Sequence, residues 1–312
     1  MKYCPDGSNT LRCFLVFGRT SLYVPATKQD SRDEADLSGL LGVNADHAAY
    51  GYRRLQLALA WSEHKTRRLM VLAGVIVLGV KRRSPHVTTT TPEPQTAPVA
   101  RVNLLKERKL IATSLHHLWA EDFTPLWFQG HWYYLATVID LYSRVVVGWA
   151  LSAHHDTDLV VSALLDALSR SEAPAILHQD QGSEYCSERY GIIAISLGIE
   201  LSFSTKGHPW ENGFQESFYR YFKIEIRAKK LDRFKELGEL SAAITKQIQY
   251  YNTERIHSAL GMSPIAFSVS GLPPRNTTKP AKQYGTKATK QPNYFQQILT
   301  GVRDKVFGIL GA

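Results

Sequence analysis

The stretch that decides the fold is HLWAEDFTPLWFQGHWYYLATVIDLYSRVVVGWALS, from His117 to Ser152. It contains three runs rich in aromatic and β-branched residues, separated by short breaks at QG and YS. Runs of this composition joined by short breaks predict consecutive antiparallel strands. A β-sheet therefore begins within this stretch.

The segments that follow alternate between helical and strand patterns. TDLVVSALLDALSRS predicts a helix with Thr157 as its N-cap, and APAILHQD predicts a short buried strand. SERYGIIAISLGIELSFS predicts a helix closed by Gly198 and a further strand. Two more helices are expected, one from about Asn212 and one over residues 235–252. This order predicts an α/β fold, a mixed five-stranded sheet with flanking helices.

Composition excludes several classes of protein. The 312 residues are 44% hydrophobic and 11% aromatic, which predicts a packed core and excludes general disorder. Cys4, Cys13 and Cys186 are too few and too scattered for a disulfide framework or a zinc finger. The longest apolar run, residues 69–80, is shorter than the roughly 20 residues of a membrane span. We therefore expect a cytoplasmic protein with no membrane role.

Charge is unevenly distributed along the chain. The net charge is +9, yet residues 118–226 hold six Lys/Arg and fourteen Asp/Glu, a net charge of −8, so the remainder carries +17. Carboxylates that hold cations, flanked by bases that neutralise phosphates, would suit a metal-using enzyme on nucleic acid. Ordinary solvated charge is the alternative interpretation.

Charge and composition also divide the chain into regions. Residues 50–83 have apolar residues at helical spacing and eight Lys/Arg against one acid, which predicts a basic helix-turn-helix-like region. Its candidate DNA contacts are Arg53, Arg54, Arg67 and Arg68, although a solvated helix face would look the same. The other predicted regions are a weakly patterned segment (1–49), a Thr- and Pro-rich linker (84–110), the catalytic core (111–270) and a basic tail (271–312).

Three carboxylates stand out within the core. Asp122 lies inside an apolar strand, where a carboxylate is costly to bury unless it is paired or binds a cation. Asp180 ends a strand at the carboxyl edge of the predicted sheet, the usual ligand side of α/β folds. Glu216 lies in the first turns of a helix, with Arg220 and Lys223 on its face. Each acid alone could be structural, but as a set they match two-metal phosphoryl-transfer chemistry.

A second glutamate, Glu211, lies five residues before Glu216 and therefore about 140° away around a helix. The two cannot face one site. Only Glu216 shares a helix face with Arg220 and Lys223. We therefore expect Glu216 to act in catalysis and Glu211 to stand at the helix start, where its charge favours the helix dipole.

The sequence resembles the integrase-core transposases of bacterial insertion sequences, of the type encoded by a second reading frame and related to retroviral integrases. The motifs that carry the resemblance are LWAEDFT, VIDLYSRVVVGWALS, LHQDQGSEYCS, LSFSTKGHPWENGFQESFYRYFKIE and YYNTERIHSALGMSPIAF. The resemblance covers roughly residues 50–267. The 35 residues between Asp180 and Glu216 resemble the D,D-35-E signature of that family, which selects Glu216 rather than Glu211.

The resemblance implies an RNase H-like fold and a DNA transposase that cleaves DNA and transfers strands. Asp122, Asp180 and Glu216 would be catalytic and would ligate two Mg²⁺ or Mn²⁺ ions, with Asn212, Arg220 and Lys223 contacting DNA. The expected partners are DNA, further copies of the chain and the product of an upstream reading frame, and the expected location is the bacterial nucleoid. Asp140 is expected to close a strand turn and pair with Arg144, and His178 to be packed rather than to ligate.

The sequence departs from the family pattern in places. Glu211 stands where Asp is usual, HQD replaces HSD, and the zinc domain of retroviral integrases is absent. Two rival functions stay open at this point. One is a catalytically silent DNA-binding and assembly protein derived from a transposase, and the other is an RNase H-like nuclease that cuts without joining.

Overall fold

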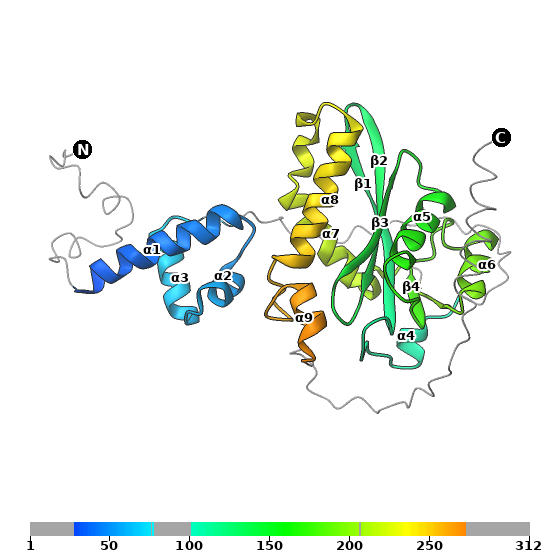
Figure 1. The fold of residues 1–312 in the computed structure, drawn as a ribbon, viewed down its shortest axis with the longest axis horizontal. Coiled ribbons are helices and arrows are strands. Elements are labelled where there is room, and N and C mark those ends of the chain that lie inside the picture. The colour runs from blue at the N-terminus through cyan, green and yellow to red at the C-terminus, as the bar shows by residue number, and fades with distance from the viewer. Residues whose placement is uncertain (1–27, 76, 78–100, 206, 273–312) are drawn as a thin grey trace. The chain divides into compact units, whose positions relative to one another are not determined.

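The computed structural model describes residues 28–75, 77, 101–205 and 207–272 (Figure 1). The chain divides into two compact units, Met1–Thr278 and Lys279–Ala312, and the second lies outside the described residues, as does most of the predicted basic tail. Within the described part, none of the helices has the length and apolar character needed to cross a bilayer.

The predicted mixed five-stranded sheet is confirmed. Its strands are β1 (Leu118–Phe128), β2 (His131–Asp140), β3 (Val146–Ser152), β4 (Ile176–Gln179) and β5 (Glu200–Phe203), in the spatial order β3-β2-β1-β4-β5. The first three pair antiparallel, whereas β4 and β5 run parallel to β1. This order places the middle of β1 beside the carboxyl end of β4, so residue 122 lies on the strand next to the one that residue 180 follows.

The hairpin between β1 and β2 turns at Gln129 and Gly130, both with positive φ, at +46° and +81°. A two-residue turn with both φ values positive matches the twist of the strands it joins. Glutamine is an unusual residue in this conformation, and its side chain is held by the backbone carbonyls of Phe234 and Lys235 at 3.0 and 2.7 Å. The turn therefore docks the hairpin on the segment that precedes α8.

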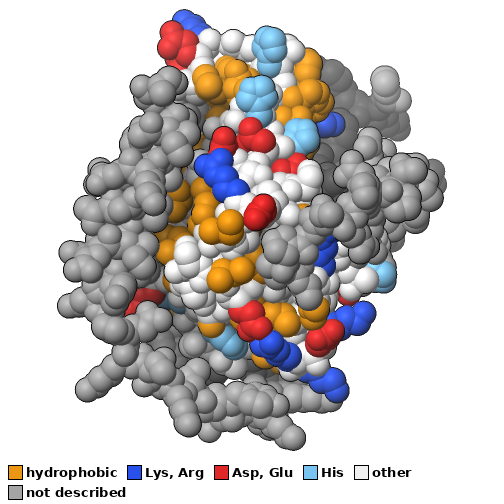
Figure 2. Space-filling view, turned by 90° about the vertical axis from the view of Figure 1, so that its right-hand side faces the viewer, with side chains coloured by type: hydrophobic (Ala, Val, Ile, Leu, Met, Phe, Trp, Pro, Cys, Tyr) orange, Lys and Arg blue, Asp and Glu red, His pale blue; other side chains and the backbone are white. Residues whose placement is uncertain are grey.

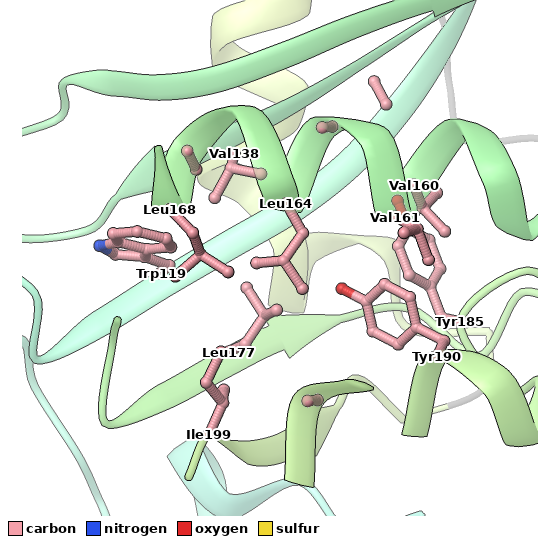
Figure 3. Close-up of a cluster of buried hydrophobic side chains, with 14 of the residues drawn as sticks. Trp119, Val138, Val160, Val161, Leu164, Leu168, Leu177, Tyr185, Tyr190 and Ile199 are labelled. Atoms are coloured by element: carbon pink, nitrogen blue, oxygen red, sulfur yellow. The ribbon is translucent and has the colours of Figure 1, made fainter. Parts of the chain in front are cut away.

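Helices cover both faces of the sheet. On one face, α5 (Thr157–Leu168) and α6 (Glu188–Ser196) bury a cluster that includes Trp119, Leu164 and Leu177 (Figure 3). On the other face, α7 (Gly213–Glu225) and α8 (Leu237–Thr253) pack on a second cluster built from alternate residues of the same strands. The strands are therefore buried on both faces, as expected for a sheet between two helical layers.

One predicted detail of α5 is wrong. The N-cap is Asp156, whose side chain accepts a hydrogen bond from the backbone of Leu159, and Thr157 is the first helical residue. A carboxylate is a stronger acceptor than a hydroxyl, and its charge complements the positive end of the helix dipole. Gly198 follows α6 with a φ of +72°, as predicted for the residue that closes this helix.

The basic helical region has a small core of its own. Its helices α2 (Tyr52–Leu59) and α3 (Glu63–Leu72) pack with the preceding helix α1 (Lys28–Asp46), and together they bury Leu40, Tyr50, Leu55 and Leu69. The two helices expected in residues 50–83 are α2 and α3. The sequence did not predict α1, which lies within the weakly patterned segment 1–49.

Short elements complete the described chain. The predicted linker 84–110 ends in α4 (Leu104–Glu107), where Leu104 is buried against Leu118 and Ile176, so residues 101–110 pack on the core. Residues 84–100 lie outside the described residues. The remaining elements are the 3₁₀ helices η2 (Pro209–Asn212) and η3 (Ala228–Arg233) and the helix α9 (Pro264–Ser270).

Candidate active site

Asp122 lies near the middle of β1, on the face covered by α7. The side-chain alternation of a strand sends Glu121 to the opposite face, where the Tyr190 hydroxyl donates a hydrogen bond to it. The Asp122 carboxylate accepts a hydrogen bond from the backbone N–H of Phe123 at 2.9 Å. Burial, followed by the charges of Asp180 and Glu216, raises the pKa of Asp122 to about 8.

Asp180 directly follows β4 at the carboxyl edge of the sheet. The backbone N–H of Gly182 donates to its Oδ1 atom at 2.8 Å. A Cβ atom at position 182 would lie 3.0 Å from this oxygen and 2.7 Å from Glu184 Oε2, so a side chain there would displace one or both carboxylates. Burial raises the pKa of Asp180, the Gly182 hydrogen bond opposes the rise, and the Glu184 charge adds to it.

Glu216 lies in the first turn of α7 and is exposed. Its charge acts on Asp122, as does that of Asp180, so both acids lie within electrostatic range of Asp122. In the described part of the chain, however, no three His, Cys, Asp or Glu side chains are gathered closely enough to hold one metal ion. The donor set consists of carboxylates, which suits Mg²⁺ or Mn²⁺, and bound cations would relieve the repulsion that Asp180 and Glu216 exert on Asp122.

Two residues of α7 fix the position of Glu216 over the sheet. Gln215 is fully buried and donates from Nε2 to the carbonyls of Ala120 and Thr137, at 2.7 and 3.0 Å. Its Oε1 accepts from the Thr137 hydroxyl at 3.1 Å, and the Tyr219 hydroxyl donates to the Asp122 carbonyl at 2.5 Å. These bonds hold α7 in register with the part of β1 that carries Asp122.

Glu211 has a separate role in the structure. It lies in η2, directly before α7, and its Oε2 accepts from the Thr205 backbone and the Asn103 side chain, both at 2.6 Å. Burial alone would raise its pKa, but these hydrogen bonds and the Lys106 charge lower it below its ordinary value. Glu211 therefore ties residues 101–110 to the start of α7, at the helix end where it was expected.

The predicted DNA contacts on and before α7 differ in accessibility. Arg220 is exposed, with its guanidinium 4.9 Å from the ring centre of Tyr221. Lys223 is half-buried, and burial lowers its pKa while the Asp122 charge opposes that change. Asn212 is only 6% exposed, so its side chain is not open to solvent.

The four arginines of the helical region also divide into two pairs. Arg53 and Arg67 are exposed, and Arg67 lies over the Tyr52 ring at 3.9 Å while pairing with Glu63 at 2.8 Å. Arg68 instead makes a two-point contact with Asp33 at 2.5 and 2.7 Å. Arg54 is buried against aromatic rings.

Figure 2 shows the face of the molecule seen from the right-hand side of Figure 1. Acidic and basic side chains lie next to one another over its middle, and hydrophobic side chains and histidines gather at its upper end. The described residues visible there form no continuous basic area. Among the described side chains visible in this view, basic groups thus lie beside acidic ones.

Two other predicted roles can be compared with the structure. Asp140 closes its turn as expected, because its Oδ1 accepts from the backbone of Tyr142 and Ser143. The expected side-chain pair with Arg144 is replaced by a stack of the Arg144 guanidinium on Phe214, at 3.8 Å. His178 is packed, as expected, with 1% exposure, and burial lowers its pKa to about 4.

Sequence reasoning missed several polar residues near the site. One is Glu184, whose Oε1 lies 2.8 Å from His155 Nδ1 and whose charge acts on Asp180. Another is Gln215, which reads as an ordinary helix residue. The only available signal was helical spacing, which places Gln215 beside Tyr219 on the face opposite to solvent.

Comparison with known proteins gives consistent matches. The family model described as Integrase core domain matches residues 112–209, and a second model with the same description matches residues 197–264. The chain is 34% identical over 196 residues to the transposase for insertion sequence element IS904 of Lactococcus lactis, covering 62% of this chain and 74% of the relative. It is 35% identical over 236 residues to the putative transposase InsK for IS150 of Escherichia coli, covering 72% and 80%.

Solved structures show a looser similarity. The HTLV-2 integrase catalytic core domain in complex with magnesium (trimeric form) aligns with a TM-score of 0.43 and 21% identity, over 50% of this chain and 97% of that one. The simian T-cell lymphotropic virus intasome in complex with PP2A regulatory subunit B56 gamma aligns with a TM-score of 0.49 and 16% identity, over 80% of each chain.

Proposed function

The chain belongs to the integrase-core transposases of bacterial insertion sequences, enzymes of the DDE polynucleotidyl transferase class, and we propose that Asp122, Asp180 and Glu216 are its catalytic acids. The observation that carries this proposal is that the charges of Asp180 and Glu216 both act on the buried Asp122 and raise its pKa. Acids that are costly to hold together without a cation are a signature of metal-dependent sites.

We propose Mg²⁺ or Mn²⁺ as the cofactor, two ions per site, held by the same three acids. When bound, such ions activate the attacking oxygen and stabilise the leaving oxygen of a phosphodiester. Asp122 is fixed by its strand and by the Phe123 amide, and Asp180 by the Gly182 amide. Glu216 is exposed on α7, and closing the site requires its side chain to approach the other two.

The proposed reaction has two steps. Water first attacks a phosphodiester at an end of the element, breaking the P–O3′ bond to leave a 3′-OH and a 5′-phosphate. The 3′-OH then attacks a phosphodiester of a second strand, forming one P–O bond as another breaks. Lys223 interacts electrostatically with Asp122, and it would neutralise a phosphate bound beside the acids. Arg220 and the exposed Arg53 and Arg67 would hold the DNA backbone.

Single substitutions at the three acids test the proposal. Asp122→Asn, Asp180→Asn and Glu216→Gln should each abolish Mg²⁺-dependent cleavage and strand transfer on duplexes carrying the ends of the element, with DNA affinity nearly unchanged. Glu211→Gln is the matched control, because it makes the same change five residues away and should retain most of the activity. Full activity in any of the three variants would remove that acid from the set.

The rival functions give different results with the wild-type protein. Cleavage without joined products would indicate a nuclease. DNA binding without cleavage at any Mg²⁺ or Mn²⁺ concentration would indicate a silent assembly protein. We propose that the enzyme acts in the nucleoid, where its DNA lies, and as a multimer, since an element has two ends to join. A requirement for an upstream reading-frame product can be tested by adding that product.

A further inference from the structure

A cavity of about 440 Å³ lies on the side of α7 away from the catalytic acids. Phe214, Ser217 and Tyr221 line it, and in a helix of 3.6 residues per turn these residues point away from Glu216. Three arginines from distant parts of the chain share the cavity, Arg54 of α2, Arg144 of the turn after β2, and Arg255 of the loop after α8. The cavity plays no part in the catalytic chemistry described above.

The cavity contains buried hydrogen-bond donors that have no acceptor. Arg144 Nε and Nη1, Arg54 Nε and Arg255 Nη2 are buried and have no hydrogen-bond partner in the described structure. Arg255 is 1% exposed and Arg54 7% exposed. Unpaired buried donors on charged groups are unfavourable, and in native proteins they commonly mark a site where a ligand or an ion binds.

The carboxylates near the cavity already form ion pairs or hydrogen bonds with other groups. Glu225 pairs with Arg255 through Nε at 2.6 Å, and Glu211 is bonded to Thr205 and Asn103. Asp140 accepts four hydrogen bonds, three from Tyr142 and Ser143 of its own turn and one from the His116 backbone. The cavity therefore keeps an excess of positive charge.

The electrostatics of neighbouring groups agree with that excess. Burial lowers the pKa of Arg144 to about 10, so its guanidinium stays charged at neutral pH. Burial, followed by the charges of Arg144, Arg255 and Arg54, lowers the pKa of His257 to about 3. The contribution of the three arginines, which adds to that of burial, indicates a positive potential in the cavity, and a positive potential favours an anion.

The packing of the arginines on aromatic rings indicates which kind of ligand the cavity would bind. Arg144 lies on Phe214 at 3.8 Å, and Arg54 and Arg255 lie on Tyr221 at 4.4 and 4.7 Å. The aromatic faces are thus covered by guanidinium groups, which leaves the N–H edges free rather than a surface for stacking a base. Guanidinium edges match the oxygens of a phosphate in a two-point geometry.

On the premise of the proposed function, we propose that this cavity binds a backbone phosphate of the DNA substrate, outside the catalytic site. A neighbouring groove of about 500 Å³ shares Arg54 and Tyr221 with the cavity and is lined by Arg53 and Arg220. Arg220 lies on the Glu216 side of α7, so positive charge continues from the cavity towards the catalytic acids. A polyanionic strand can contact these groups together, whereas a single free phosphate cannot.

The test measures binding by the full-length protein in EDTA, so that its result does not depend on catalysis. Arg144→Gln removes one arginine that has no ion pair in the described structure, and Arg170→Gln, at an exposed arginine paired with Asp166, is the control. A 30-bp duplex is titrated by fluorescence anisotropy at several KCl concentrations, and inorganic phosphate is titrated by thermal shift. Arg144→Gln should bind the duplex about tenfold more weakly. Its slope of log K against log salt should fall by about 0.9.

The outcomes separate the alternatives. Unchanged duplex and phosphate binding by folded Arg144→Gln would overturn the proposal. Loss of phosphate stabilisation with unchanged duplex binding would overturn the DNA assignment in favour of a small free anion. If Arg144→Gln does not fold, Ser217→Glu places a negative charge at the cavity, and it must weaken duplex binding relative to Ser217→Gln or the proposal fails. A wild-type protein that binds as described but does not cleave would refute the proposed function and not this site.

Discussion

Glu121 and Asp122 are adjacent carboxylates with opposite surroundings. The pleat of β1 turns Glu121 into the core beside Tyr185 and Tyr190, and burial raises its pKa well above the ordinary value. Asp122 faces α7 and the other two acids. One residue of strand register therefore separates a buried acid hydrogen-bonded to a tyrosine from a catalytic candidate.

A histidine away from the catalytic acids should make stability depend on pH. His257 has an ordinary pKa of 6.5 when unfolded and a pKa of about 3 in the folded protein. Between these values the unfolded chain binds a proton that the folded chain does not, so stability should fall as pH decreases from 6.5 towards 3. The expected loss is about 1.4 kcal/mol per pH unit, or about 2 kcal/mol by pH 5.

Urea denaturation of the wild type and of His257→Gln at pH 7, 6 and 5 measures this loss. The variant should lose less stability than the wild type as pH falls, because it lacks the group that titrates. His64→Gln removes an exposed histidine from α3 and serves as the control. Parallel stability curves for the wild type and His257→Gln would contradict the prediction.

At the scale of elements, α7 decides the geometry of the active site. Its face towards the sheet is polar at Gln215 and Tyr219 and apolar at Phe218 and Phe222. The apolar residues supply burial, but they would tolerate a small rotation or slide of the helix. The hydrogen bonds from Gln215 to β1 and β2 have preferred directions, so they restrict the position of α7, and with it that of Glu216, relative to Asp122.

Replacing Gln215 by Leu tests this positioning role. The substitution leaves the carbonyls of Ala120 and Thr137 without their side-chain donor, which should cost about 2–3 kcal/mol of stability. It should also lower kcat at least tenfold with little change in DNA affinity, because Glu216 moves relative to Asp122 while no basic side chain is removed. Gln249→Leu, at an exposed position of α8, is the matched control and should leave both values near wild type. A kcat close to wild type in folded Gln215→Leu would contradict the role.

The sequence predicted those elements that a run of neighbouring residues is enough to identify. The three antiparallel strands follow from β-branched and aromatic runs, and the separation of Asp180 and Glu216 can be read directly. It did not predict α1, because KQDSRDEADLSGLLGVNAD is polar and shows weak periodicity, and its apolar residues become meaningful only against α2 and α3. The hydrogen bonds of Gln215 and the cluster of Arg54, Arg144 and Arg255 could not be predicted, because their members meet only when the chain has folded.

At the scale of the whole molecule, the described contacts join the basic helical region to the catalytic core. The Tyr50 hydroxyl accepts a hydrogen bond from the Ile256 backbone at 2.6 Å, and His47 Nδ1 lies 2.6 Å from the Tyr250 hydroxyl. Arg54 adds its stack on Tyr221. These contacts join the basic residues 50–75 to the acidic block 118–226, which has a net charge of −8, and so bring positive charge next to an acidic part of the chain.

The basic tail should contribute to that binding through charge. Residues 273–312 carry seven Lys/Arg and one acid, so their removal takes away six net positive charges. The slope of log K against log salt is negative, and its magnitude decreases by about 0.9 for every phosphate that the shortened protein no longer neutralises. The magnitude of the slope for a duplex should therefore decrease by between one and about five. The weakening should affect unrelated sequences equally, because binding to phosphates carries no sequence information.

Anisotropy titrations of the full chain and of the protein ending at residue 272, at 50 to 200 mM KCl, measure the change. Circular dichroism melting controls for folding, and the two proteins should melt within a few degrees of each other, because the described core is intact in both. An equal salt slope would show that the tail does not contact phosphate, and the electrostatic binding would then rest on the helical region and on the groove lined by Arg53 and Arg220. Because Arg144→Gln is expected to change the slope by only about one, the two experiments together would apportion the electrostatic binding between the tail and the cavity beside α7.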